Sequence, residues 1–152
     1  MKFNNKIIFF IIIASEIFFY CPDLLFSASL EDEIVVVVNL NNPVNSLTPK
    51  EVSDLFLSRR RTFPSGEAVI LIEQERNSFL REKFFYLINK MTVRRVNAYW
   101  ARLQFSGEVQ PPEYLPNSQA VLEVIRKNTN AIGYVDFANV DDSVRVVLHL
   151  KD

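Results

Sequence analysis

Five consecutive β-branched residues, Ile34 to Val38, form the most constraining stretch of this chain. A strand whose successive side chains are all apolar is buried on both faces, whereas a strand with one solvated face alternates apolar and polar residues. Other elements must therefore cover this strand on both sides. With 152 residues the chain is long enough for one domain with a substantial core, and we place the first strand of that domain here.

A short helix is predicted a few residues after this strand. Thr48 is followed by Pro49 and, three residues after Thr48, by Glu51, which is the pattern of a capping box with proline at the first helical position. The apolar residues of the segment fall on one face of such a helix: Val52, Leu55 and Phe56. The helix should end at the basic run Arg59–Arg61, because cations are favoured near the carboxyl end of a helix.

Strand and helix signals alternate along the rest of the chain. Apolar runs predict strands at residues 68–72, 131–135 and 144–150, and capping residues predict helices that open at Ser78, at Thr92 and at Asn117 or Ser118. Residues 108–116 hold three prolines and are predicted to form a loop. Strands that alternate with helices indicate an α/β domain.

The first 28 residues are typical of an export signal. Lys2 and Lys6 precede an apolar run at residues 7–20, and small residues around Ala28 suit a signal peptidase. We therefore predict a signal peptide at residues 1–28, a domain at residues 29–152 and a periplasmic or otherwise extracytoplasmic location. The alternative is an uncleaved anchor, although the run is shorter than the ~20 residues of a spanning helix.

Composition excludes several classes of function. The predicted leader contains the only cysteine, Cys21, so the mature domain has no thiolate for a disulfide or a metal site. The leader holds two basic and two acidic residues, so the mature domain keeps the net charge of −1, which does not favour a nucleic-acid partner. The single histidine, His149, has no second ligand motif, and no nucleophile or glycine-rich phosphate motif is present. We therefore expect no metal, no cofactor and no enzymatic activity.

Several segments resemble the substrate-binding proteins of phosphate ABC transporters. In that family a strand ends in asparagine and is followed by a turn that contains proline. A helix comes next: leucine and threonine stand at its start, a glutamate follows three residues after the threonine, and phenylalanine and a basic residue stand at its end. The matching residues are Val36–Asn39, Asn42-Pro43, Leu47-Thr48, Glu51, Leu55-Phe56, Arg59 and Phe63, joined later by Tyr99-Trp100, Phe105–Gly107 and Ala131–Val135. The resemblance covers about residues 34–150. It implies an α/β fold that corresponds to a single lobe of a type II periplasmic-binding-protein-like fold, in which a small mixed sheet is flanked by helices. It also implies recognition of phosphate or a similar small oxyanion for ABC-type uptake.

The resemblance also implies a site at the start of the helix that opens at Ser78. Full-size relatives hold the phosphate there with backbone amides and hydroxyls, so the ligand-binding candidates are Arg76, Ser78 and Arg81. The alternative for these residues is structural, because serine is a good helix cap and arginines usually lie in water.

A second group of candidates follows the first strand. Asn39, Asn42 and Ser46 could line a cleft at its carboxyl end, where open α/β sheets bind ligands. They are also ordinary turn residues.

The resemblance leaves the partners open. A single lobe is too short to clamp a ligand alone, so an ABC permease, another envelope protein or a second copy in a homodimer are the candidate partners. The alternative function is a non-enzymatic envelope interaction module that keeps the fold without a small ligand. That alternative gains weight if Phe79, which replaces a glycine of the relatives, fills the cleft, or if Glu73 or Glu75 neutralises Arg76. Arg95, Tyr99 and Arg102 share a helix face that could contact a partner.

Overall fold

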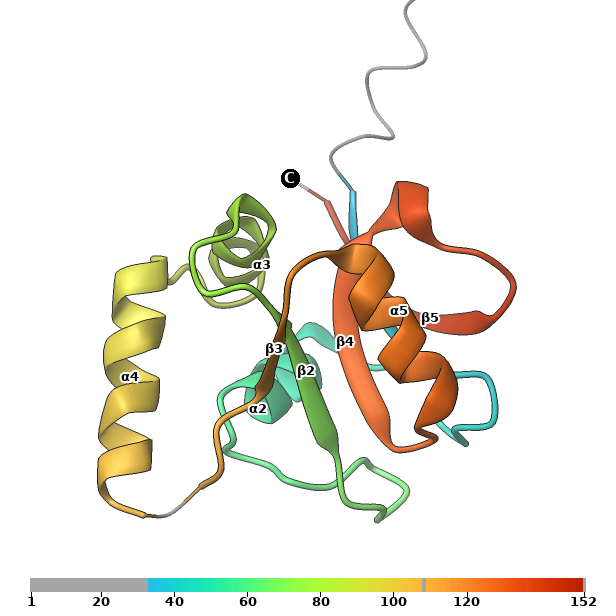
Figure 1. Ribbon diagram of the computed structural model, residues 1–152. Coiled ribbons are helices and arrows are strands. Elements are labelled where there is room, and N and C mark those ends of the chain that lie inside the picture. The colour runs from blue at the N-terminus through green and yellow to red at the C-terminus, as the bar shows by residue number, and fades with distance from the viewer. Residues whose placement is uncertain (1–32, 108, 152) are drawn as a thin grey trace, which may run out of the picture.

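The computed structural model describes residues 33–107 and 109–151 and shows a mixed five-stranded sheet (Figure 1). The predicted signal peptide at residues 1–28 lies outside the described residues. The strand order is β3-β2-β4-β1-β5. The strands are β1 (Ile34–Asn39), β2 (Ile70–Gln74), β3 (Glu113–Leu115), β4 (Ala131–Asp136) and β5 (Val144–Leu150). Strands β2, β3 and β4 are parallel, whereas β1 runs antiparallel to both of its neighbours, β4 and β5. The predicted α/β class is confirmed.

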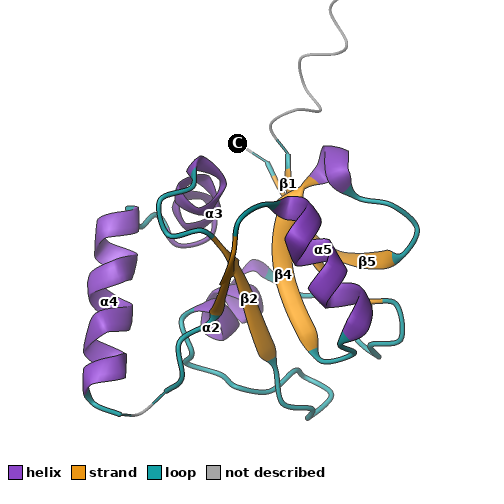
Figure 2. Cartoon of the chain, viewed as in Figure 1, coloured by secondary structure: helices purple, strands orange, loops and turns teal. Residues whose placement is uncertain are grey.

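Helices cover both faces of the sheet (Figure 2). Helix α5 (Ser118–Lys127) packs on one face against Val35 and Val37 of β1. Helices α2 (Pro49–Phe56) and α3 (Phe79–Asn89) pack on the other face with Val36 and Val38, and α4 (Val93–Phe105) lies outside α3. All six residues of β1 are buried, as the run of β-branched residues predicts. Burial of each valine contributes about 1.5–3 kcal/mol of transfer free energy.

The helices begin at the residues that the sequence indicates. Thr48 forms the full capping box with Glu51 at the start of α2. The side chains of Ser78, Thr92 and Asn117 each accept a hydrogen bond from a backbone N–H in the first turn of α3, α4 and α5. These bonds satisfy amides that have no acceptor within the helix.

Two strand predictions need correction. Strand β2 begins at Ile70 rather than at residue 68, because Ala68 instead pairs with Thr62 across the preceding turn. The loop predicted at residues 108–116 contains β3, which pairs with β2. The prolines lie just outside its three residues, and an edge strand needs hydrogen bonds on one side only, so they do not prevent this short pairing.

Gly133 of β4 lies directly beneath α5. A Cβ atom at this position would lie 2.7 Å from Cγ1 of Val121, well inside normal contact distance. The absence of a side chain therefore allows α5 to approach the sheet closely.

Among residues 33–107 and 109–151, no helix combines the length and the apolar character that a membrane span requires.

Candidate functional site

The topology places a switch point at the carboxyl ends of β2 and β3. These two strands are parallel neighbours, but β2 leads into α3 on one face of the sheet and β3 leads into α5 on the other. Open α/β sheets bind ligands where adjacent connections diverge in this way. We call the side of the sheet formed by the carboxyl ends of β2, β3, β4 and β5 the carboxyl edge; it is the upper edge in Figure 1.

The amino terminus of α3 lies at this switch point and has backbone amides without a hydrogen-bond acceptor among the described residues. Ser78 Oγ accepts from the amide of Arg81 at 3.2 Å. Among the described residues, none accepts a hydrogen bond from the amides of Phe79 and Leu80. The side chain of Phe79 is 74% exposed, so it does not plug the site. Free amides and the positive end of the helix dipole make this terminus suitable for an anion.

Arg76 and Tyr114 lie together at the switch point. The guanidinium of Arg76 is 4.7 Å from the centroid of the Tyr114 ring, which brings the loop after β2 against the last strand before α5. Arg76 is exposed, and Glu73 pairs with a different arginine. The Arg76 charge is therefore available at the surface.

Arg81, by contrast, is completely buried. Its Nε donates to Oε2 of Glu73 at 2.5 Å. Its Nη1 donates to Oδ1 of Asn97 at 2.9 Å and to the carbonyl oxygen of Arg76 at 3.3 Å. The buried Arg81 side chain therefore connects the loop after β2 to α4 through hydrogen bonds.

The Glu73–Arg81 pair is only partly satisfied. Within the described part of the chain, Oε1 of Glu73 and Nη2 of Arg81 are buried without a hydrogen-bond partner. Burial raises the pKa of Glu73 to about 7, and the neighbouring Arg81 charge opposes this rise. Burial, followed by the charge of Glu73, also raises the pKa of Tyr134 and of Tyr114.

The structure places Asn39, Asn42 and Ser46 at the opposite edge of the sheet. Because β1 is antiparallel to its neighbours, Asn39 pairs with Val144, the first residue of β5. Its Nδ2 donates to the carbonyl oxygens of the last turn of α5, at 2.8 and 2.9 Å. Asn42 Nδ2 donates to the carbonyl of Thr129 at 2.8 Å, and Ser46 is exposed. The structure therefore brings Arg76, Ser78 and Arg81 together, but it does not bring the other three candidates to them.

Further polar residues at the carboxyl edge were not indicated by the sequence. Buried Gln74 donates through Nε2 to the carbonyl of Tyr134 at 3.1 Å and to Oγ of Ser118 at 3.4 Å. Ser118 opens α5 and also accepts from the amide of Asp136 at 3.3 Å. The one available signal was a glutamine at the end of an apolar strand, which is unusual for a buried position.

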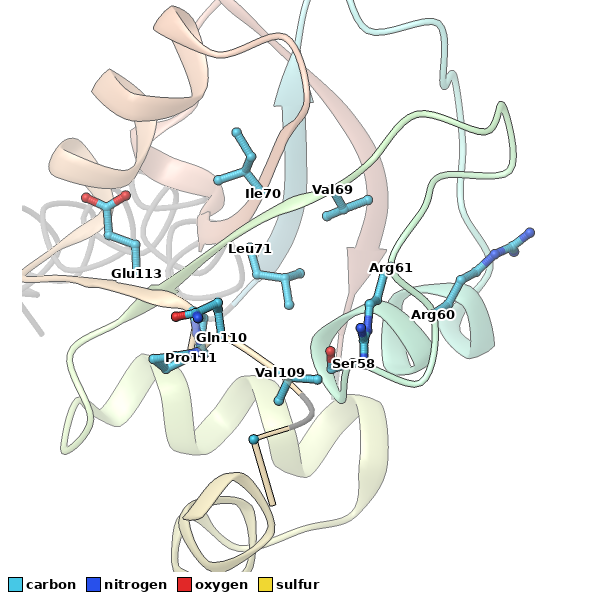
Figure 3. A pocket seen from close by; sticks show the side chains of 12 residues that line it. Ser58, Arg60, Arg61, Val69, Ile70, Leu71, Val109, Gln110, Pro111 and Glu113 are labelled. Atoms are coloured by element: carbon cyan, nitrogen blue, oxygen red, sulfur yellow. The ribbon is translucent and has the colours of Figure 1, made fainter. Parts of the chain in front are cut away.

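A groove of about 520 Å³ lies at the other end of β2 (Figure 3). Val69, Ile70 and Leu71 form part of its lining, and Arg60 and Arg61 in the loop after α2 form another part. None of the six predicted ligand-binding residues lines it. It lies at the amino end of β2, away from the amides of α3.

No group of three or more histidine, cysteine, aspartate or glutamate side chains is placed to hold a metal ion among residues 33–107 and 109–151.

The mixed sheet, its single antiparallel strand and the helices on both faces define one lobe of a periplasmic-binding-protein-like fold. Solved structures of such proteins are similar to this chain. One is described as a phosphate ABC transporter substrate-binding protein with bound phosphate from Clostridium perfringens (TM-score 0.62, 23% identity, covering 78% of this chain and 46% of the other). Another is an ABC-type phosphate transport receptor from Vibrio cholerae (TM-score 0.61, 19% identity, covering 78% and 47%). A third is PstS from Borrelia burgdorferi (TM-score 0.61, 11% identity, covering 76% and 46%).

These similarities confirm the fold implied by the sequence resemblance. The chain spans less than half the length of each of these structures. No protein-family model matches the sequence, and a search of curated proteins finds no match.

Proposed function

We propose that this chain is an exported, non-enzymatic binding domain that recognises phosphate or a similar small oxyanion at the amino terminus of α3. The observation that carries the proposal is the pair of unpartnered amides, Phe79 and Leu80, beside the Ser78 hydroxyl at the carboxyl edge of a binding-protein lobe. The similar structure from Clostridium perfringens contains phosphate. Backbone amides at a helix start suit a doubly charged oxyanion because they donate hydrogen bonds without a cost of reorganisation.

The candidate residues take different roles in this proposal. The hydroxyl group of Ser78 donates a hydrogen bond to the ligand, and the exposed guanidinium of Arg76 supplies a positive charge opposite the anion. Arg81 acts as a positioning residue, because it is buried and holds the carbonyl of Arg76. Asn39 and Asn42 hold the carboxyl end of α5 and the turn after it, and they take no part in the proposed site.

We also propose how the domain works in the cell. The predicted signal peptide sends it to the periplasm or an equivalent compartment. An ABC permease is the proposed partner for uptake, because similar structures are named as receptors of such transporters. The site is open to solvent on one side, so pairing with a second copy in a homodimer would supply further ligand contacts.

The test is titration of the full-length chain with inorganic phosphate by isothermal calorimetry. We expect saturable binding that R76Q and S78A each weaken by roughly 10-fold or more, as expected for loss of a hydrogen bond to a charged group. R59Q is the matched control, since it removes an exposed arginine that follows α2 and is not part of the loop that leads into α3. Absence of heat up to millimolar phosphate would refute the proposal and favour the envelope interaction module.

A further inference from the structure

The second half of α3, α4 and the residue pair that follows carry an unusual charge distribution. Residues 83–107 contain five cations and no aspartate or glutamate. The whole chain has 17 basic and 18 acidic residues, so the positive charge of this segment is not a property of the chain as a whole. The five cations are Lys83, Lys90, Arg94, Arg95 and Arg102.

Three of these cations share the outward face of α4. Successive residues of a helix are rotated by about 100° around its axis, so Arg94 and Arg95 lie on one side of α4 and Arg102 projects between them when viewed along the axis. All three are exposed, as are Ala98 and Ala101 between them. No carboxylate of the described residues forms an ion pair with any of the three arginines.

The opposite side of α4 fixes this face toward solvent. Val96 and Trp100 are buried in the core. Asn97 accepts a hydrogen bond from Arg81, and the Tyr99 hydroxyl donates to the carbonyl of Leu57 at 2.8 Å. The helix is therefore held in one rotation, and the arginines cannot turn inward to find a carboxylate.

The outward face of α4 is accessible to a partner from outside the molecule. Helix α4 is the outermost element on its side of the molecule (Figure 1). The groove beside it, lined by Met91, Arg95, Ala98, Tyr99 and Arg102, has a volume of about 330 Å³. The face continues at Phe105, whose side chain is 96% exposed at the end of the helix. Basic side chains near a membrane are attracted to anionic lipid, and aromatic rings are favoured in the interfacial region of a bilayer.

We propose that the outward face of α4 docks on anionic phospholipid headgroups. Arg94, Arg95 and Arg102 pair with the phosphodiester groups, which guanidinium can bind with two parallel hydrogen bonds. Phe105 enters the interfacial region, where aromatic rings are favoured. This surface would orient the domain on a membrane independently of the proposed oxyanion site.

The experiment is co-sedimentation of the full-length chain with two kinds of vesicle, phosphatidylcholine alone and phosphatidylcholine mixed with phosphatidylglycerol. The leader is common to all variants, so its contribution cancels in the comparison. The triple variant R94Q, R95Q and R102Q removes the proposed face. The control K50Q, K127Q and K151Q removes the same number of charges from exposed positions elsewhere. Circular dichroism checks that each variant is folded.

We expect the wild type to prefer the anionic vesicles at low salt and to lose the preference at high salt. The α4 variant should lose it by roughly fivefold per arginine, or on the order of 100-fold in total, whereas the control should retain it. Equal losses in both variants, or no preference in the wild type, would overturn the proposal. Binding to polyglutamate but not to anionic vesicles would also overturn it, in favour of an acidic protein partner.

Discussion

Glu73 gives a sharp prediction about the pH dependence of stability. Its carboxyl group is fully buried and its pKa rises from 4.5 to about 7, mainly because burial disfavours the charged form. The folded chain therefore holds a proton on Glu73 over a pH interval in which the unfolded chain has released it. The stabilisation that this provides is complete below pH 4.5 and is lost as the pH rises through about 7.

The size of the effect follows from the width of this interval. One pH unit corresponds to about 1.4 kcal/mol, so the whole interval corresponds to about 3 kcal/mol of unfolding free energy. Most of it should be lost between pH 5 and pH 8. Carboxylates with lowered pKa values, such as Glu51, Asp54 and Asp141, contribute in the opposite direction but below this range.

The assay is urea denaturation, with unfolding free energies measured at pH 5 and at pH 8. The chain carrying H149Q is the reference, because this change removes the single histidine, so that Glu73 can be tested in a chain without histidine. We expect E73Q in that background to abolish the loss of stability at pH 8, since the amide cannot ionise yet still accepts a hydrogen bond from Arg81. Stability that is constant or rises from pH 5 to pH 8 in the reference chain would show that Arg81 keeps Glu73 ionised, and the reasoning would fail.

Three further changes test the fold. G133A should lower the unfolding free energy by about 1–3 kcal/mol, because its Cβ would meet the stiff Val121 side chain at 2.7 Å; an unchanged denaturation midpoint would contradict the close approach of α5. T48A should lower the unfolding free energy by about 1 kcal/mol, because it removes the capping box of α2. A decrease in unfolding free energy smaller than the measurement error of urea denaturation would contradict this role of Thr48. N39A should lower the unfolding free energy by about 1–3 kcal/mol, because it removes the side-chain amide that donates to two carbonyls of α5. Calorimetry should show phosphate affinity equal to that of the wild type, and weaker binding would place Asn39 in the site.

The sequence predicts the local structure well because local structure depends on neighbouring residues. Thr48, Ser78 and Thr92 cap helices wherever the chain places them, and the run from Ile34 to Val38 is buried whichever neighbours it pairs with. Strand β3 was not predicted because its pairing with β2 depends on tertiary contact rather than on its own residues.

The candidate site was predictable only in part, for a similar reason. The start of α3 follows β2 directly, so Arg76 and Ser78 lie close together in any fold with this order of elements. The direction of β1 depends on pairing with β4 and β5, which the sequence pattern does not encode, and this direction moves Asn39 to the far edge. Burial of Arg81 likewise depends on the partners Glu73 and Asn97, one on β2 and one on α4.

The position of β1 between β4 and β5 also determines when this chain can fold. Glu33 and His149, which contact each other beside this strand, are separated by 116 residues in sequence. During synthesis, β1 is made before β4 and β5 and has neither neighbour until they follow it. Contacts between such distant residues form slowly, so pairing of β1 with β4 and β5 should be a late step in the folding of the domain.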